Sequence, residues 1–304
     1  MAENGDARRF RLRDGESAPN GIQRIACGQL DMSIERLDGE TDEDTGTAVH
    51  ETRKSLKRLR TTVRLARDEL GEDVYRRENV GFRDAGRRLA GARDSQVLLE
   101  TLAAVSDRDG AARDGCTPLR RTLSAQHAAA QKNLQEGEAV GEVVSELREA
   151  RARVPEWPLE GESLDALAPG FKRLYRRGRR AYRKARDEPS SENLHELRKR
   201  VKDLWYAAQI VRPAARKRMK RTARKAHRLS DLIGEEHDLA LLAERAAQRR
   251  DRFDDDAAAD DLAERIERRR AELRSDALEL GSRLYRRKPR KMVRPLEKSA
   301  SRAA

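Results

Sequence analysis

Apolar residues recur along most of the chain at the three-to-four-residue spacing of amphipathic helices. The stretch 20–37 shows this clearly, because Ile22, Ile25, Leu30 and Ile34 fall on one stripe and polar residues fill the opposite side. Alternation of apolar and polar residues at the two-residue period of a β-strand is essentially missing. The pattern therefore predicts an all-α protein.

Glycines, prolines and capping residues divide this pattern into helices. In the first half, helices are predicted over about 20–37, 47–71, 73–90, 94–102 and 117–154, the last with a break after Gly137. In the second half they are predicted over about 169–187 (with a start as early as 164), 191–211, 213–233, 239–252 and 259–286. We expect Gly91 and Gly234 to stop helices, and Asp94 and Asp238 to cap the helices that follow.

A stretch with Pro155, Pro158 and Gly161 disfavours a continuous helix and marks a boundary between two halves. Short connections favour antiparallel neighbours, so we predict two antiparallel four-helix bundles related by pseudo-two-fold symmetry. The predicted divisions are a flexible lead-in (1–18), a first four-helix half (19–154), a linker (155–163), a second four-helix half (164–288) and a basic tail (289–304).

One stretch of the chain occurs twice, as HETRKSLKRLR at 50–60 and HELRKRVKDLW at 195–205. We call the helices that carry these copies the first and second motif helices. At a constant offset, the first copy matches the second in these pairs: His50 and His195, Glu51 and Glu196, Arg53 and Arg198, Lys54 and Lys199, Lys57 and Lys202, Leu59 and Leu204. Because the shared residues are mostly cationic, the repeat indicates function as well as fold.

On a helical wheel of about 100° per residue, the cations of each copy fall in one sector and its leucines and valines in another. A charged face opposite an apolar face is ordinarily solvated, but such faces usually mix charge signs. Residues 52–67 contain no acid, so like charges repel along the stripe unless an anion offsets them. Arginine binds phosphate oxygens bidentately, lysine adds point charges, and a protonated histidine can also donate. The stripes therefore predict a linear polyanion as the ligand.

Two further stretches, 171–184 and 216–228, carry many cations and no acid, and we expect their helices to line the same groove. Arg93 and His237 are candidates for the mouth of this groove. The predicted binding residues are His50, Arg53, Lys54, Lys57, Arg60, Arg64, Arg83, Arg87, Lys172, Arg176, Arg179, Arg183, His195, Arg198, Lys199, Lys202, Lys225 and Arg228.

The whole chain of 304 residues has a formal net charge of +13 and a pI near 10.1, which also indicate a polyanionic partner or surface. Its two cysteines make neither a disulfide framework nor a metal cage, and neither motif histidine has a second histidine at zinc-site spacing. We expect no metal and no cofactor. The N-terminus lacks the apolar region of a signal peptide and no apolar run could span a bilayer, so we expect a cytoplasmic protein without a membrane partner.

These motifs resemble those of the CHAD family, the conserved histidine α-helical domain. The resemblance rests on H-x-x-R-K-x-x-K-x-L-R at 50–60, H-x-L-R-K-x-x-K at 195–202, G-A-R-D at 91–94 and L-I-G-E-E-H-D at 232–238, and it covers about 20–285. It implies two four-helix bundles in pseudo-symmetry and a basic groove that binds inorganic polyphosphate. Some members are fused to triphosphate-hydrolysing CYTH domains, whose E-x-E-x-K strand motif is absent from this sequence.

The second copy departs from the first at Asp203, which matches Arg58, and at Trp205, which matches Arg60. The second stripe is therefore shorter, and we expect Trp205 and Tyr206 to pack or to line the edge of the groove. By the same reasoning, we expect the first half to contribute much of the contact with the anion.

These observations predict a non-catalytic protein that binds inorganic polyphosphate, with polyphosphate granules as a candidate location. A nucleic-acid-binding helical protein is the alternative, since it would share the electrostatics, although no recognition-helix or RNP-like signature is present. An enzyme or accessory protein of polyphosphate or triphosphate metabolism comes third, because the basic helices contain neither a P-loop nor an acidic cluster for Mg²⁺. No catalytic residue is assigned, and the oligomeric state stays open.

Overall fold

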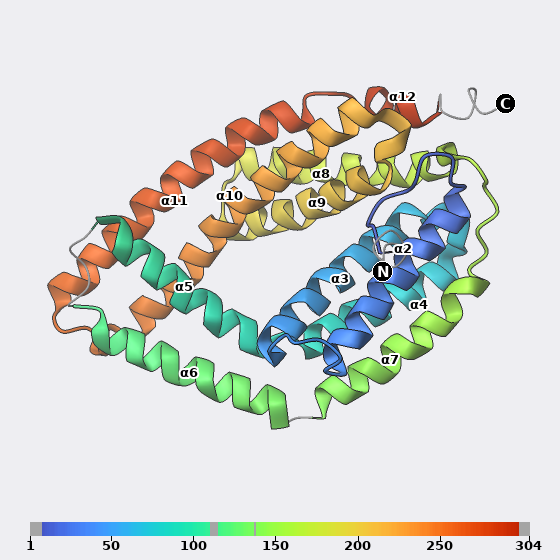
Figure 1. The fold of residues 1–304 in the computed structure, drawn as a ribbon. Coiled ribbons are helices and arrows are strands. Elements are labelled where there is room, and N and C mark those ends of the chain that lie inside the picture. Colours follow the sequence, from blue (N-terminus) through green and yellow to red (C-terminus); the bar gives the residue numbers. More distant parts are fainter. Residues whose placement is uncertain (1–7, 110–114, 137, 298–304) are drawn as a thin grey trace.

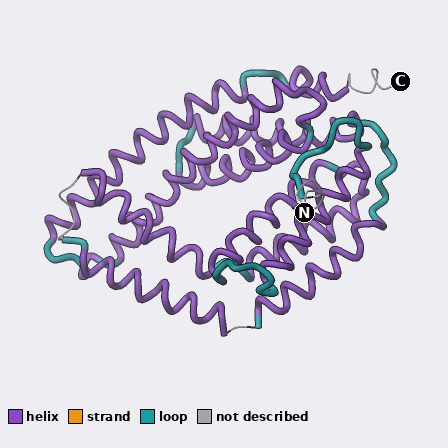
Figure 2. Tube along the Cα trace, viewed as in Figure 1, coloured by secondary structure: helices purple, strands orange, loops and turns teal. Residues whose placement is uncertain are grey.

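The structure is a computed structural model that describes residues 8–109, 115–136 and 138–297. Throughout these residues the regular structure is helical, as Figures 1 and 2 show, so the all-α prediction is confirmed. Among the described helices, none combines the length and the apolar character that a bilayer span requires.

Four helices of the first half pack against one another: α2 (Ala18–Leu37), α3 (Thr45–Leu65), α4 (Arg67–Arg88) and α7 (Ala139–Arg153). The side chains of Ser17 and Asp44 cap α2 and α3, because each accepts a hydrogen bond from a backbone N–H in the first turn. The apolar stripes of the four helices meet in a buried core that includes Leu30, Leu56 and Leu147.

Four helices of the second half form a similar group: α8 (Ala168–Asp187), α9 (Ser191–Ile210), α10 (Arg216–Gln248) and α11 (Asp256–Tyr285). Ser190 caps α9 and Asp255 caps α11 in the same way. The predicted linker joins the two groups through the 3₁₀ turns η1 (Val154–Glu156) and η2 (Leu164–Leu167), with Trp157 buried between them. Two further 3₁₀ turns, η3 (Arg212–Ala215) and η4 (Arg250–Arg252), flank α10.

A helical hairpin connects the two groups a second time. Its helices, α5 (Gly91–Asp109) and α6 (Thr117–Glu136), pack against each other, and α5 also packs against α10. Leu102 and Leu119 of the hairpin form a separate core with Leu242 of α10 and Ile266 of α11. Figure 1 shows the hairpin reaching from the first group to the far ends of α10 and α11.

The two groups also touch directly, because α3 packs against α8 and α9 and the main apolar core runs through both groups. The first and second motif helices, α3 and α9, therefore lie at the junction. The pseudo-two-fold relation between the groups stays a prediction.

The two glycines that were expected to stop helices differ from each other: a helix boundary does lie beside Gly91, because α4 ends at Arg88, whereas Gly234 lies inside a helix. Helix α5 begins at Gly91, so Asp94 lies inside the helix rather than at its cap. Helix α10 runs unbroken through Gly234 and Asp238. A Cβ atom at Gly234 would lie 2.8 Å from an Nη atom of Arg198, so this glycine makes room for an arginine of the second motif helix.

The first motif helix also ends earlier than expected. Helix α3 ends at Leu65, and Gly71 lies within α4, where its φ of 71° and ψ of 167° interrupt the helical backbone. A residue with a Cβ atom is strained at such a positive φ, which explains why glycine occupies this kink.

The described part of the predicted lead-in packs on both groups. Leu12 is 1% exposed, and its backbone N–H donates to the carbonyl oxygen of Ile210 at 3.1 Å. Arg24 of α2 binds Glu16 at 2.6 Å. Residues 8–17 are therefore held in place, and residues 1–7 lie outside the described part.

The predicted basic tail begins with a helix, α12 (Pro289–Glu297), which packs against α8. Met292, Val293 and Leu296 of α12 are buried in the main core. This part of the tail is thus a structural element, and residues 298–304 lie outside the described part.

Candidate functional site

The apolar residues of the two motif helices fix how their cations are presented. Leu56 and Leu59 on α3, and Leu197 and Leu204 on α9, are at most 1% exposed. Burying each of these side chains stabilises the fold by about 1.5–3 kcal/mol. Their burial sets the rotation of each helix and leaves the cationic sectors at the helix surfaces.

Three predicted binding residues from the two copies meet around Lys202. Burial, and then the positive charges of Arg198 and Lys57, lower the pKa of Lys202 from 10.5 to about 7. The carboxylates of Asp231 and Asp238 on α10 act in the opposite direction without offsetting this effect. The structure therefore brings cations of α3 and α9 together at Lys202, where burial is the largest cause of the lowered pKa.

Backbone features hold two arginines of the motifs in place. Arg53 donates from Nη1 to the carbonyl oxygen of Ala90 at 3.1 Å, which ties the first motif helix to the end of α4. Arg198 lies against the backbone of α10 at Gly234, where any larger residue would meet its guanidinium group. Both arginines are thus partly pre-positioned before any ligand is bound.

The glutamate of each motif balances part of the charge. Lys54 pairs with Glu51 at 2.7 Å, and Lys199 lies 3.7 Å from Glu196. These pairs are partly exposed, so each contributes about 1 kcal/mol or less. Of the four motif lysines, the other two, Lys57 and Lys202, lie at the centre of the junction.

The two motif histidines lie in different surroundings. The ring of His195 lies 4.6 Å from the ring of His237 on α10. Burial, followed by the charges of Lys199 and His237, lowers the pKa of His195 to about 4. His195 is therefore neutral at pH 7 and adds no positive charge there. His50 is 38% exposed at its side chain, and its Nε2 lies 4.0 Å from a carboxylate oxygen of Glu51.

A second cluster of cations surrounds Asp203, whose side chain is only 8% exposed. Arg64 binds this carboxylate at 2.7 Å, and Arg200 lies 3.5 Å from it. Burial lowers the pKa of Arg60 to about 10 and shifts that of Arg177 in the same direction. One carboxylate thus lies among four arginines, and the cluster keeps a net positive charge.

This cluster changes the expected asymmetry between the copies. In the sequence, Asp203 only shortened the second stripe, whereas in the structure it is the counter-ion of Arg64 from the first copy. Arg64 is therefore held in a buried ion pair rather than standing on an open stripe.

Helix α8 turns a different row of cations toward the motif helices than expected. Arg173 donates to the carbonyl oxygen of Arg64 at 3.4 Å, and Arg177 shares the field of Asp203. Arg179, from the predicted row, donates instead to the carbonyl oxygen of Tyr285 on α11 at 3.2 Å. The other members of the predicted row are half-buried or exposed, namely Lys172, Arg176 and Arg183.

The predicted binding residues on α4 lie beside an acid, and those on α10 line separate hollows. Arg83 and Arg87 both lie beside Asp84, at 2.8 and 3.5 Å, which offsets part of their charge. Lys225 and Arg228 line two different hollows, of about 350 and 550 Å³. Besides burial, the charge of Arg83 nevertheless contributes to lowering the pKa of Arg60 on α3, and Arg228 shares its hollow with Trp205 of α9.

The aromatic residues that end the second motif divide between packing and lining. Trp205 lines the 550 Å³ hollow and lies 4.0 Å from the ring of His227, measured between ring centroids. Tyr206 is buried, with the guanidinium carbon of Arg58 5.9 Å from its ring centroid. Tyr206 therefore packs as expected, whereas a role for Trp205 at the edge of a polyanion groove stays a prediction.

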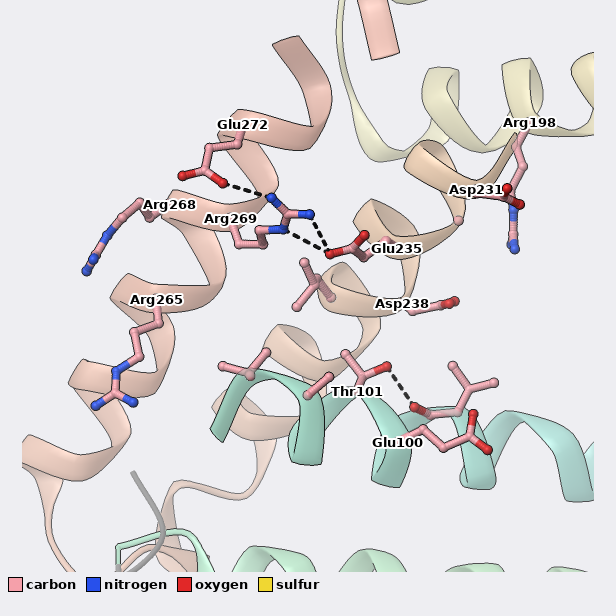
Figure 3. A pocket seen from close by; sticks show the side chains of 15 residues that line it. Glu100, Thr101, Arg198, Asp231, Glu235, Asp238, Arg265, Arg268, Arg269 and Glu272 are labelled. Atoms are coloured by element: carbon pink, nitrogen blue, oxygen red, sulfur yellow. Dashed lines mark hydrogen bonds and ion pairs between the residues drawn. The ribbon is translucent and has the colours of Figure 1, made fainter. Parts of the chain in front are cut away.

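A larger hollow, of about 600 Å³, lies between α5, α10 and α11, and Arg198 reaches it from α9 (Figure 3). Figure 3 shows Arg269 between Glu235 and Glu272, and it lies 2.9 Å from each carboxylate. Acids balance the arginines of this hollow, which shares Arg198, Asp231 and Asp238 with the surroundings of Lys202. Within the described residues, no three His, Cys, Asp or Glu side chains are grouped as a metal ion would require.

Sequence reasoning missed Arg177 and Arg200, which complete the cluster around Asp203. A usable signal was present, because an acid inside a cationic motif indicates that nearby arginines face it. His237, a candidate for the groove mouth, does contact a motif histidine. The side chain of Arg93 lies outside the described part.

Comparisons with known proteins agree with this fold. The family model described as "CHAD domain" matches residues 28–247, and no curated protein matches the sequence. The crystal structure of the CHAD domain from the plant Ricinus communis is similar to this chain, with a TM-score of 0.66 and 17% identity. That similarity covers 90% of this chain and 94% of the plant chain. Because the family model spans most of the sequence, the chain belongs to the CHAD family.

Proposed function

We propose that this chain is a non-catalytic module that binds inorganic polyphosphate at the junction of α3 and α9. The observation that carries the proposal is the meeting of Lys57, Arg198 and Lys202, where burial and like charges lower the pKa of Lys202 to about 7. Such a cluster disfavours its own protonated state. A phosphate chain would reverse this effect, because its negative charges stabilise the protonated lysine.

The spacing of the cations favours a chain over a single phosphate. Lys57 and Arg64 lie about 10 Å apart along α3 and point in nearly the same direction around the helix axis. Arg60 lies between them, and burial, followed by the positive charge of Arg64, lowers its pKa to about 10. A ligand with several linked phosphates could contact the Lys202 and Asp203 clusters together, whereas one phosphate could not.

The most informative experiment is competition between long-chain polyphosphate and nucleic acid at physiological salt. Labelled polyphosphate would be bound to the protein and displaced with unlabelled polyphosphate, duplex DNA or single-stranded RNA. We expect polyphosphate to displace the label at a concentration of phosphate at least tenfold lower than either nucleic acid. Equal displacement by all three would favour a general polyanion or nucleic-acid binder instead.

Charge reversal at the junction tests the site itself. R53E/K57E should weaken polyphosphate binding by at least tenfold at low salt, because it replaces two attractions with two repulsions. The matched control is R120E/R121E, which makes the same change of net charge on exposed residues of α6. If both variants lose affinity equally, net charge rather than this site governs binding. Circular dichroism would verify that helicity is retained.

The non-catalytic part of the proposal has its own test. Purified protein incubated with polyphosphate and Mg²⁺ should release no orthophosphate above a protein-free blank. Release that scales with protein concentration would assign the chain to polyphosphate metabolism.

A further inference from the structure

A second cationic hollow lies at the other end of α10, between its first turns, the end of α11 and α12. It has a volume of about 350 Å³. Besides Arg283, six of its lining side chains are cations from two segments of the chain: Lys217, Arg218, Arg221, Lys225, Arg286 and Arg287. No lining residue is an acid. The hollow therefore differs from the mixed-charge hollow of Figure 3.

These six cations lack the ion pairs that are common elsewhere in the described part of the chain. Arg283, which also lines the hollow, pairs with Glu279, but within the described residues no carboxylate lies at ion-pair distance from the six. Lys217 and Arg218 also lie in the first turn of α10, where positive charge opposes the helix dipole. Cations gathered around one hollow repel one another, and a bound anion would offset this repulsion.

The hollow is distinct from the junction of the motif helices. Arg221 and Asp231, whose carboxylate acts on Lys202 at the junction, lie on the same helix, about 15 Å apart along its axis at 1.5 Å per residue. His237 contacts the second motif helix, whereas Arg221 faces the region of α11 and α12. A ligand of the hollow would therefore leave the junction free.

We propose that this hollow is a separate site for a compact oligophosphate, such as pyrophosphate or triphosphate. Guanidinium groups bind phosphate oxygens bidentately, and Thr222 adds a hydroxyl to the lining. The apolar part of the lining consists of Leu284 and Met292, without an aromatic ring on which a nucleobase could stack. The residues therefore recognise charge density rather than a base, and the volume suits a short chain.

The test uses the full chain with K57E/R198E at the junction, so that remaining binding reports the hollow. In this background, R221E/R287E is compared with K220E/K288E, and triphosphate binding is measured by isothermal titration calorimetry. Lys220 and Lys288 are exposed neighbours that do not line the hollow, so both pairs change the net charge equally. We expect at least a tenfold loss of affinity in R221E/R287E and less than a twofold loss in K220E/K288E.

Equal losses in the two pairs, or no triphosphate binding in the K57E/R198E background, would overturn the proposal. Binding of long-chain polyphosphate but not triphosphate in that background would also contradict it, because a compact ligand is specified. Should R221E/R287E fold poorly, R221Q/R287Q keeps the side-chain lengths similar and removes the charges. Failure of this site leaves the polyphosphate proposal intact, since that proposal depends on the unmodified junction.

Discussion

Lys202 lies where the two motif helices bring their charges together, and its pKa of about 7 makes its charge sensitive to pH near neutrality. This pKa lies below the ordinary 10.5, so between these two values the unfolded chain binds more protons than the folded one. Lys202 therefore makes the stability of the free protein rise with pH across that window. A bound phosphate chain favours the protonated amine, so binding takes up a proton there.

It follows that polyphosphate affinity should fall as the pH rises above 7, by up to about tenfold per pH unit. K202R should remove most of this dependence while it retains binding at pH 7, because arginine stays protonated. The measurement is the dissociation constant at pH 6, 7, 8 and 9 and constant ionic strength. K199R serves as the control, since Lys199 is exposed and has an acidic partner. A wild-type slope in K202R would contradict this role of Lys202.

At the scale of the helix, Gly234 shows how packing across an interface decides the role of a glycine. In α10 it allows the guanidinium of Arg198 to lie close to the backbone, at a distance that a Cβ atom would not tolerate. Glycine inside a helix is less favourable than alanine by about 1 kcal/mol. The fold thus gives up some helix stability at this position, and the presentation of Arg198 depends on it.

The G234A substitution should weaken polyphosphate binding while it leaves the stability of the fold nearly unchanged. Alanine favours the helix, and Arg198 is long enough to move aside, so we expect the melting temperature to stay within a few degrees of the wild type. Polyphosphate affinity should fall severalfold, because Arg198 is displaced from the junction. G81A is the control, since a Cβ at Gly81 in α4 has no neighbour within 4 Å and should leave binding unchanged. Equal affinities in the two variants would show that the position of Arg198 is unimportant.

The same helices show what could be predicted from the sequence. Apolar periodicity identified most helices, and the repeated motif singled out Lys57, Arg198 and Lys202, which the structure brings together. Both signals lie within single segments. Gly91 and Gly234 look alike in sequence, yet one begins a helix and the other lies inside one. At Gly234 the neighbouring group is Arg198 of another helix, which no local pattern contains.

The site was predicted less completely for a related reason. A stripe on α8 was expected at 172, 176, 179 and 183, but Arg173 and Arg177 approach the first and second motif helices. A shift of one residue rotates a helix face by about 100°. A helix with cations nearly all round gives no sign of which of them face a partner. The contacts of α8 with α9, α11 and α12 decide the rotation.

At the scale of the molecule, the apolar core extends beyond the two four-helix groups. This extra burial helps to offset the repulsion among the excess positive charges. The main core extends to Leu12 before α2 and to Leu296 in α12. Self-repulsion in a chain of net charge +13 opposes the compact state. The segments at both ends therefore contribute apolar contacts that help to hold a cationic molecule together.

Deleting residues 289–304 should consequently destabilise the protein even though it removes positive charge. Met292, Val293 and Leu296 are at most 3% exposed, and burial of each contributes about 1.5–3 kcal/mol. We expect the melting temperature to fall by roughly 10 °C or more in a scanning calorimeter. Deletion of 298–304 alone is the control and should change it little, because these three side chains remain. An unchanged melting temperature in the longer deletion would mean that α12 makes no net contribution to stability, because charge repulsion offsets the burial of its apolar side chains.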